Sequence, residues 1–223
     1  AIAHPDLTGE EPKDVIQACR SCADMVPDLH PTNLEYSLAE MAPLTEDTPS
    51  ALCAFDLAFY DLLGLAAGMP LHRLLGGYRH RIQTSVTLGI APLAETVEMA
   101  VARAAQGFRM LKIKGGLDAE EDVHRVQAVH RALPGFTVRL DADGGYTVQQ
   151  ALDVARALEG DLEMLEQPTP PDDLEALRQV TKYSPVPVLA AQSVTDAASA
   201  LEVASRKAAD GINVKVAACG GLR

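Results

Sequence analysis

From residue 83 to the end of the chain, short apolar segments that predict β-strands alternate with longer segments of helical periodicity. The predicted strands lie at residues 83–88, 110–114, 137–141, 162–166, 186–190 and 211–216. The predicted helices lie between them, at residues 94–105, 119–132, 147–158, 174–181 and 195–206. Strand ends recur roughly every 25 residues, and this alternation indicates repeated βα units around a parallel sheet.

Two architectures contain such units, an open doubly wound sheet and a closed (β/α)8 barrel. A doubly wound sheet usually has a glycine-rich phosphate-binding turn after its first strand, and Leu88-Gly-Ile-Ala-Pro-Leu93 is not such a turn. Polar or charged residues end nearly every predicted strand, and in a barrel they would gather at one mouth, where barrel active sites lie. We therefore predict an α/β fold of the (β/α)8 (TIM) barrel type. Six of the eight units are visible, so the barrel is expected to be incomplete.

The first part of the chain predicts helices and no strands. Helical periodicity covers residues 12–25, 33–41, 51–67 and 71–75, and Thr8-Gly-Glu-Glu11 fits a capping box before the first of these segments. Thr48 is a plausible N-cap with Pro49 at the first helical position. The segment that follows is apolar on almost every face, which predicts a buried helix. We expect a helical domain at residues 1–80 and a partial barrel at residues 81–223.

The charge and the apolar segments exclude several classes of partner. The net charge of −12 leaves no basic surface for nucleic acid or an anionic membrane. We find no apolar run of membrane-spanning length and no basic segment followed by an apolar one at the N-terminus, so we expect a cytoplasmic protein. The four cysteines do not form a dense disulfide framework.

Two lysines lie one residue apart in Met110-Leu-Lys-Ile-Lys-Gly-Gly116. On a strand, Lys112 and Lys114 point to the same face, roughly 7 Å apart. Their mutual repulsion and desolvation at a strand end would lower a lysine pKa, towards the range in which the amine acts as a base. The alternative is an edge strand that its lysines protect from pairing.

Asp141 and Glu166 end consecutive predicted strands, so their carboxylates can reach one cation. Oxygen ligands with room for substrate and water suit Mg²⁺ or Mn²⁺. In a closed barrel, Lys114 and Lys215 would stand on opposite sides of that cation. This arrangement suits removal of a proton next to a carboxylate, with the metal stabilising the enediolate. Each carboxylate taken alone is more often a surface acid or a helix cap.

Four motifs together resemble the muconate-lactonizing branch of the enolase superfamily, which is the mandelate racemase/muconate lactonizing enzyme family. They are Lys112-Ile-Lys114, Leu140-Asp-Ala-Asp-Gly-Gly-Tyr146, Leu165-Glu-Gln-Pro168 and Ile212-Asn-Val-Lys-Val-Ala-Ala-Cys-Gly-Gly221. Within that branch, the chain is most similar to dipeptide epimerases of the L-Ala-D/L-Glu type. The resemblance implies that the N-terminal helices are the helical part of an α+β capping domain.

The resemblance also implies a role for each site residue. Lys114 and Lys215 would be the acid/base pair, and Lys112 would support the substrate carboxylate and tune Lys114. Asp141 and Glu166 would hold Mg²⁺ or Mn²⁺. The implied partners are a small-molecule carboxylate substrate and further copies of the chain in a homo-oligomer.

One position departs from the family pattern. The family's third metal ligand is an aspartate in an Asp-Glu-Ser motif, and here that place reads Ala190-Ala-Gln-Ser193. Ala191 has no oxygen to offer, so metal binding should weaken unless Gln192, Asp143 or water fills in. The family usually has asparagine where Asp143 stands, so this carboxylate could partly restore the local charge.

We therefore expect a metal-dependent epimerase or racemase acting at the α-carbon of a dipeptide or an N-acyl amino acid. A muconate-type cycloisomerase is the alternative among enzymes. A non-catalytic or truncated relative with a disabled metal site is the alternative of another class. Ala191 favours this last hypothesis, and the presence of all three lysines opposes it.

Overall fold

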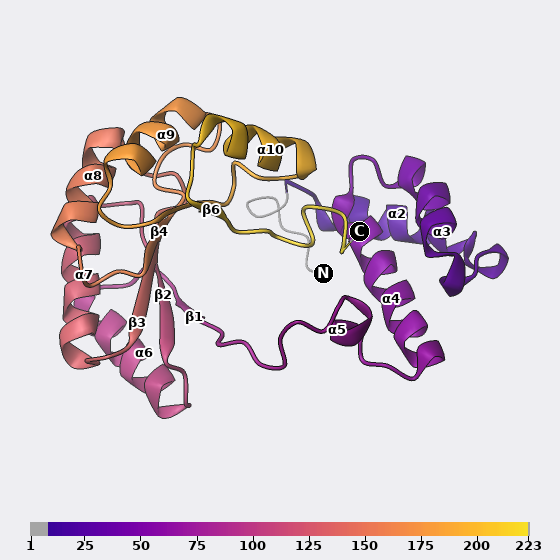
Figure 1. The fold of residues 1–223 in the computed structure, drawn as a ribbon, viewed down its shortest axis with the longest axis horizontal. Helices are drawn as coiled ribbons and strands as arrows, with labels where there is room; N and C mark the ends of the chain where they lie inside the picture. Colours follow the sequence, from indigo (N-terminus) through magenta and orange to yellow (C-terminus); the bar gives the residue numbers. More distant parts are fainter. Residues whose placement is uncertain (1–8, 223) are drawn as a thin grey trace. The chain divides into compact units, whose positions relative to one another are not determined.

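The computed structural model describes residues 9–222, which divide into two compact units (Figure 1). One unit contains residues 9–81 together with residues 214–222, and the other contains residues 82–213. The first is helical and the second is built on a parallel sheet. Each unit is described by itself below.

The helical unit packs its helices around a small apolar core of Cys22, Leu38, Met41 and Phe59. Its α-helices are α2 (Pro12–Ala23), α3 (Leu34–Met41), α4 (Pro49–Ala67) and α5 (Leu71–Leu74), with 3₁₀ turns at Val26–Asp28, Pro31–Asn33 and Ala42–Leu44. The capping box expected at Thr8 begins outside the described residues. The N-cap of α2 is Glu11, which makes no side-chain capping bond. All four cysteines are free in the structure.

Helix α4 begins as predicted, with Thr48 at the N-cap and Pro49 following, and it ends at Gly68 in the left-handed conformation. The expectation of a buried helix is wrong, because Leu57, Leu62 and Leu65 are exposed.

The expectation that the chain has no apolar segment of membrane-spanning length is also wrong. In the described part of the chain, α4 alone is long and apolar enough to cross a membrane. Core helices of soluble proteins pass the same test, and α4 packs against α2 and α3.

The second unit is a six-stranded sheet in the order β1-β2-β3-β4-β5-β6, and every pair of neighbours is parallel. The strands are β1 (Val86–Leu88), β2 (Met110–Lys114), β3 (Thr137–Asp141), β4 (Met164–Glu166), β5 (Val188–Ala190) and β6 (Gly211–Ile212). The helices between them are α6 (Leu93–Ala105), α7 (Ala119–Ala132), α8 (Val148–Ala157), α9 (Leu174–Tyr183) and α10 (Ala197–Arg206). This is the predicted succession of βα units.

The helices line one face of the sheet, and successive helices contact each other (Figure 1). Alternation along each strand divides its side chains between the two faces. Leu111 and Ile113 of β2 are buried in the main core, as are Val138 and Leu140 of β3. The residues between them face the other way. A sheet with helices on one face is a barrel-type sheet, whereas a doubly wound sheet is covered on both faces.

The predicted bounds are correct for β2 and β3, and four strands are shorter than predicted. Strand β5 begins at Val188, directly after Pro187, which has no N–H to donate to a neighbouring strand. Strand β6 ends at Ile212, whereas the sequence predicted a strand to residue 216. Beyond β6, the Asn213 N–H still donates to the carbonyl of Ala190, at 2.8 Å, and the next residue begins the segment that belongs to the helical unit.

Candidate active site

Parallel register brings the predicted site residues of three strands into adjacent positions. Lys114 pairs with Asp141 across β2 and β3, and Asp141 pairs with Glu166 across β3 and β4. Paired residues of a parallel sheet point to the same face, and Lys112 shares this face because it lies two residues before Lys114. The carboxyl ends of these strands therefore carry a cluster of two ammonium groups and two carboxylates on the face opposite the helices.

Lys112 links the two carboxylates that were predicted to bind metal. Its Nζ lies 2.8 Å from Asp141 Oδ2 and 2.7 Å from Glu166 Oε2. The side chains of Asp141 and Glu166 are 3% and 5% exposed, so both are buried acids that need a positive partner. Asn213 donates its Nδ2 to Glu166 Oε1, at 2.6 Å. The two carboxylates converge because one ammonium group contacts both.

Lys114 also contacts two carboxylates, and it shares one of them, Asp141, with Lys112. Its Nζ lies 2.9 Å from Asp141 Oδ2 and 2.5 Å from Asp143 Oδ2. Burial lowers the pKa of Lys114, but its hydrogen bonds to Asp143 and Asp141 outweigh burial, and the pKa is raised above its ordinary value. The predicted lowering of this lysine pKa is therefore wrong, because neighbouring carboxylates affect it more than Lys112 does.

The same contacts act in the opposite direction on Asp141. Burial raises the pKa of its carboxyl group, and hydrogen bonds from Lys112 and Lys114 lower it by more, so the net shift is downward. Asp141 is thus held as a carboxylate between two ammonium groups. The raised pKa of Lys114 and the lowered pKa of Asp141 both favour the charged form of the group.

Asp143 occupies a special backbone position in the loop after β3. Its φ is +46°, in the left-handed region that aspartate and asparagine tolerate better than most residues. Its backbone N–H donates to Asp141 Oδ1, at 3.2 Å, and its Oδ1 accepts a short hydrogen bond from Gln192 Nε2. Asp143 therefore joins Lys114 to the loop after β5, which carries the departure from the family motif.

Ala191, at the position of the family's third metal ligand, is buried and only 1% exposed. Its backbone N–H donates to Gln167 Oε1, at 2.8 Å. Gln167 also accepts from the Ser193 N–H and donates to Ser193 Oγ, at 3.1 and 2.9 Å. Its remaining bond is from Nε2 to the carbonyl of Thr169. Gln167 thus fixes the loop after β5.

The sequence indicated Gln167 only as one of the polar residues at a strand end. Its role depends on a φ of +39° and on complete burial, which turn its amide towards the next loop. Its position directly after Glu166, in the Glu-Gln-Pro motif, is the feature of the sequence that could have indicated a role for Gln167.

A second buried network lies under the turn after β2. Asp122 of α7 accepts hydrogen bonds from the Gly116 N–H, at 2.7 Å, and from the Tyr146 hydroxyl, and it pairs with Arg125. Arg125 in turn donates to the carbonyl of Lys114, at 2.9 Å. The network therefore holds the backbone at the end of β2, where the catalytic lysine was predicted. Sequence analysis missed Asp122 and Arg125, because helical spacing alone does not reveal a buried pair.

The turns after β2 and β3 also approach each other backbone to backbone. A Cβ on Gly116 would collide with the carbonyl of Ala142, and one on Gly145 would collide with the carbonyl of Gly116. Gly116 has a φ of +100° as well. Glycine is therefore required here by space, and at Gly116 also by conformation.

Lys215 lies three residues beyond the end of β6, in the segment that belongs to the helical unit. Its carbonyl accepts hydrogen bonds from the N–H groups of Ala218 and Cys219, at 2.9 and 3.1 Å. The structure thus gathers Lys112, Lys114 and the predicted metal-binding residues in one unit. It assigns Lys215 to the other unit.

The donors at this site suit a hard divalent cation such as Mg²⁺ or Mn²⁺, since they are oxygens. Within residues 9–222, no group of three or more His, Cys, Asp or Glu side chains is arranged to hold a metal ion. That finding agrees with alanine at position 191. Asp141 and Glu166 nevertheless converge, and Gln192 Oε1 is a buried oxygen that has no hydrogen-bond partner in the described structure. A cation held by two carboxylates and a third donor of another kind would take the place between Asp141 and Glu166 that Lys112 Nζ holds in this structure.

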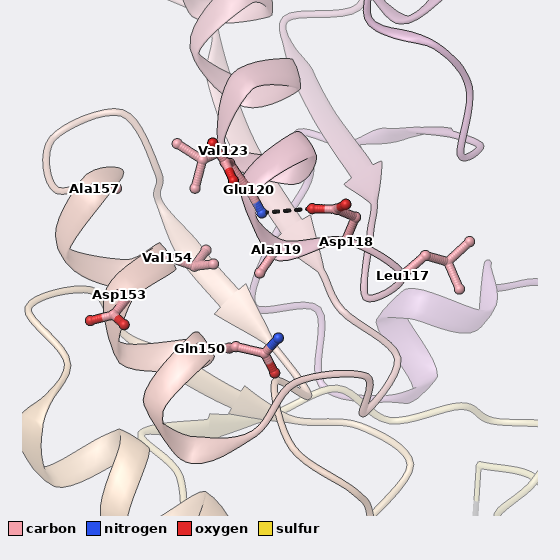
Figure 2. Close-up of a pocket in the computed structure, with 9 residues that line it drawn as sticks. All are labelled: Leu117, Asp118, Ala119, Glu120, Val123, Gln150, Asp153, Val154 and Ala157. Atoms are coloured by element: carbon pink, nitrogen blue, oxygen red, sulfur yellow. Dashed lines mark hydrogen bonds between the residues drawn. The ribbon is translucent and has the colours of Figure 1, made fainter.

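A separate pocket lies between the start of α7 and helix α8, away from these side chains (Figure 2). Its lining includes Leu117, Val123 and Val154, together with Gln150 and the acids Asp118, Glu120 and Asp153. The hydrogen bond drawn in Figure 2 joins the Glu120 N–H to Asp118 Oδ1, which caps α7. None of the predicted site residues lines this pocket.

The sequence model of the enolase C-terminal domain-like family matches residues 95–223. The chain belongs to the enolase superfamily, in the mandelate racemase/muconate lactonizing enzyme family. The family predicted from the four motifs is therefore confirmed, and so is the α/β fold with its barrel-like sheet and N-terminal helices.

Among individual proteins, the chain is similar to the hydrophobic dipeptide epimerase of Enterococcus faecalis. The two are 36% identical over 219 residues, which are 97% of this chain and 62% of the relative. The L-Ala-D/L-Glu epimerase of Bacillus subtilis is 34% identical over 193 residues, covering 84% of this chain and 53% of the relative. The chain thus spans between half and two thirds of the length of these curated relatives.

A solved structure shows the same similarity. The dipeptide epimerase of Enterococcus faecalis V583, in complex with Mg and the dipeptide L-Leu-L-Tyr, superposes with a TM-score of 0.93 at 35% identity. The match covers 98% of this chain and 62% of that one. The fold of this chain is therefore that of the corresponding part of a dipeptide epimerase.

Proposed function

We propose that this protein is an epimerase that exchanges the α-proton of a carboxylate substrate, and that the substrate is a dipeptide or an N-acyl amino acid. The observation that carries the proposal is the cluster in which Lys112 and Lys114 share Asp141. Two lysines and a pair of convergent carboxylates on one face of a barrel-type sheet suit chemistry next to a carboxylate. The similarity to dipeptide epimerases supports the substrate class.

Each residue has a distinct part in this proposal. Lys114 returns a proton to the α-carbon as the ammonium and takes the α-proton as the amine, and Lys215 is the second acid/base group of the proposed reaction. Lys112 carries the positive charge that attracts the substrate carboxylate. Asp141 and Glu166 would hold a divalent cation, Mg²⁺ or Mn²⁺, which supplies positive charge against the negative charge that develops on the substrate carboxylate.

Asp143 orients Lys114 in this scheme. Its contact with Nζ, at 2.5 Å, holds the flexible lysine side chain at the end of β2. The network of Asp122 and Arg125 fixes the backbone from which that side chain extends. A base that is positioned in advance needs no reorganisation when the substrate binds.

The test is α-proton exchange in D₂O, followed by ¹H NMR on a panel of hydrophobic dipeptides and L-Ala-L-Glu in the presence of Mg²⁺. Exchange with at least one dipeptide is expected, and Lys114→Ala should slow it by roughly 10²- to 10⁴-fold, the usual contribution of an acid/base group. Lys182→Ala, which removes an exposed lysine of α9, is the matched control and should not slow exchange. Exchange that persists unchanged in Lys114→Ala, or no exchange with any substrate of the panel, would contradict the proposal.

A further inference from the structure

The loop after β5 lacks a carboxylate at the place where the family motif has one, and its backbone is not free to move. Ala191 contributes only a methyl group, and its N–H is bound by the buried amide of Gln167. Gln167 binds the Ser193 N–H as well, so the peptide on either side of Gln192 is fixed. The side chain of Gln192 therefore extends from a rigid support at the carboxyl end of β5.

The amide of Gln192 has a defined orientation. Its Nε2 donates to Asp143 Oδ1, and this assignment is the only reasonable one, since an amide oxygen facing a carboxylate oxygen would repel it. The amide oxygen must then point away from Asp143. Gln192 Oε1 is buried and has no hydrogen-bond partner among the described residues. Buried acceptors without a partner are uncommon, and an unfilled ligand position is one reason for them.

A chain of contacts joins this amide to the convergent carboxylates. Asp143 accepts from Gln192 with one carboxylate oxygen, and its other oxygen contacts Lys114 Nζ at 2.5 Å. Lys114 Nζ lies 2.9 Å from Asp141 Oδ2. Gln192 is thus part of the same polar cluster as Asp141, three contacts away from it.

We propose that Gln192 Oε1 is the third protein ligand of a divalent cation bound by Asp141 and Glu166, and that Asp143 orients it through Nε2. This inference rests on the metal dependence within the proposed function. Amide oxygens are ordinary ligands for hard cations. The substitution leaves two anionic ligands in place of three, so the affinity for the cation is lower than that of a site with three carboxylates.

The experiment measures Mn²⁺ binding to the purified protein, by calorimetry and by the electron paramagnetic resonance signal of unbound Mn²⁺. Gln192→Leu keeps the size of the side chain and removes the oxygen, and it should weaken binding about tenfold or more. Gln192→Glu would place a carboxylate against that of Asp143, so it is made together with Asp143→Asn; this double variant should bind Mn²⁺ about tenfold more tightly than Asp143→Asn alone, which a misfolded variant cannot do. The direction of each change follows from the number and the charge of the oxygen ligands.

Gln179→Leu is the matched control, because Gln179 also donates its Nε2 to a carboxylate, that of Glu175 on the exposed surface of α9. It should leave Mn²⁺ affinity unchanged. Asp143→Gly tolerates the left-handed backbone and removes the oxygen that accepts from Gln192 Nε2. It should weaken binding by roughly 10- to 100-fold, as the loss of an outer partner of a ligand does.

The outcomes separate this inference from the proposed function. Equal affinity in Gln192→Leu and the natural chain, together with loss of binding in Glu166→Gln, would overturn the role of Gln192 and leave the metal-dependent reaction standing. Binding that appears only in Ala191→Asp would overturn both the role of Gln192 and the metal dependence of the natural protein. Proton exchange in D₂O without added metal then decides whether the reaction itself survives.

Discussion

Asp56, in the middle of α4, accepts a hydrogen bond from the backbone N–H of Leu222, at 2.7 Å, although 166 positions separate them in the chain. Asp56 is fully buried. Within the helical unit, α4 therefore holds the segment that follows β6 and carries Lys215. The same segment is closed on itself by a hydrogen bond from the Gly221 N–H to the carbonyl of Val216, at 3.1 Å.

Replacing Gly221 by alanine should destabilise this contact. Gly221 has a φ of +138°, and a Cβ there would collide with the carboxylate of Asp56. We expect the free energy of unfolding to fall by about 2 kcal/mol or more, from backbone strain and overpacking. Urea denaturation followed by circular dichroism measures the loss. Gly160→Ala is the control, because its φ is +88° with open space around it, so only backbone strain applies there. Equal losses in the two variants would show that the contact with Asp56 is unimportant.

Tyr146→Phe should reveal the contribution of the network under the turn after β2. The variant removes the hydroxyl that donates to the buried carboxylate of Asp122. A hydrogen bond to a charged group contributes about 1.5 to 3 kcal/mol, and we expect a decrease of that size in the free energy of unfolding. Tyr78→Phe alters a residue that is 91% exposed and should change stability by less than about 0.5 kcal/mol. A loss for Tyr146→Phe no larger than that control would contradict the prediction.

The same tyrosine predicts how stability depends on alkaline pH. Burial, and then the hydrogen bond and charge of Asp122, raise the pKa of Tyr146 above its ordinary value of 10.0. The folded protein therefore keeps a proton that the unfolded chain releases above pH 10, so the contribution of Tyr146 is complete below pH 10 and falls as the pH rises further. The difference in unfolding free energy between the natural protein and Tyr146→Phe should shrink from pH 9 to pH 11. A difference that grows over this range would have the wrong sign.

Gln167→Ala should destabilise the loop after β5. It leaves the N–H groups of Ala191 and Ser193 without their acceptor. One buried and one part-buried backbone donor left unsatisfied cost roughly 2 to 4 kcal/mol in unfolding free energy. Gln127→Ala removes one exposed hydrogen bond to a backbone carbonyl and should cost less than about 0.5 kcal/mol. Thermal unfolding of the two variants in parallel provides the check, and a small effect of Gln167→Ala would mean that water replaces its amide.

The sheet was predictable because each strand carries its own local signal. Strand β2 alternates buried Leu111 and Ile113 with polar lysines and stops at a glycine pair, so both of its ends could be read from the sequence. Strand β6 could not be read in the same way. The apolar residues beyond Ile212 continue the strand pattern, but Asn213 makes the last bond to β5 and the chain then joins the other unit. Tertiary packing decides such an end.

The convergence of Asp141 and Glu166 was predictable from the sequence, and the electrostatics of the cluster were less so. Lys112 and Lys114 could be placed on one face from their spacing, whereas the pairing of Lys114 with Asp141 depends on strand register. The hydrogen bonds of Lys114 to Asp143, in the loop after β3, and to Asp141 decide the direction of its pKa shift. Gln167 could not be assigned, because its function requires a left-handed backbone that no local pattern indicated.

The backbone contact between Gly116 and Gly145 restricts how this site can diverge. Because no side chain can be inserted between the two turns, the spacing of the strand ends that carry Lys114 and Asp141 cannot be changed by a single substitution there. A change of substrate in descendants of this protein would have to arise from residues elsewhere around the site. Gly116 and Gly145 would remain glycine while those other residues change.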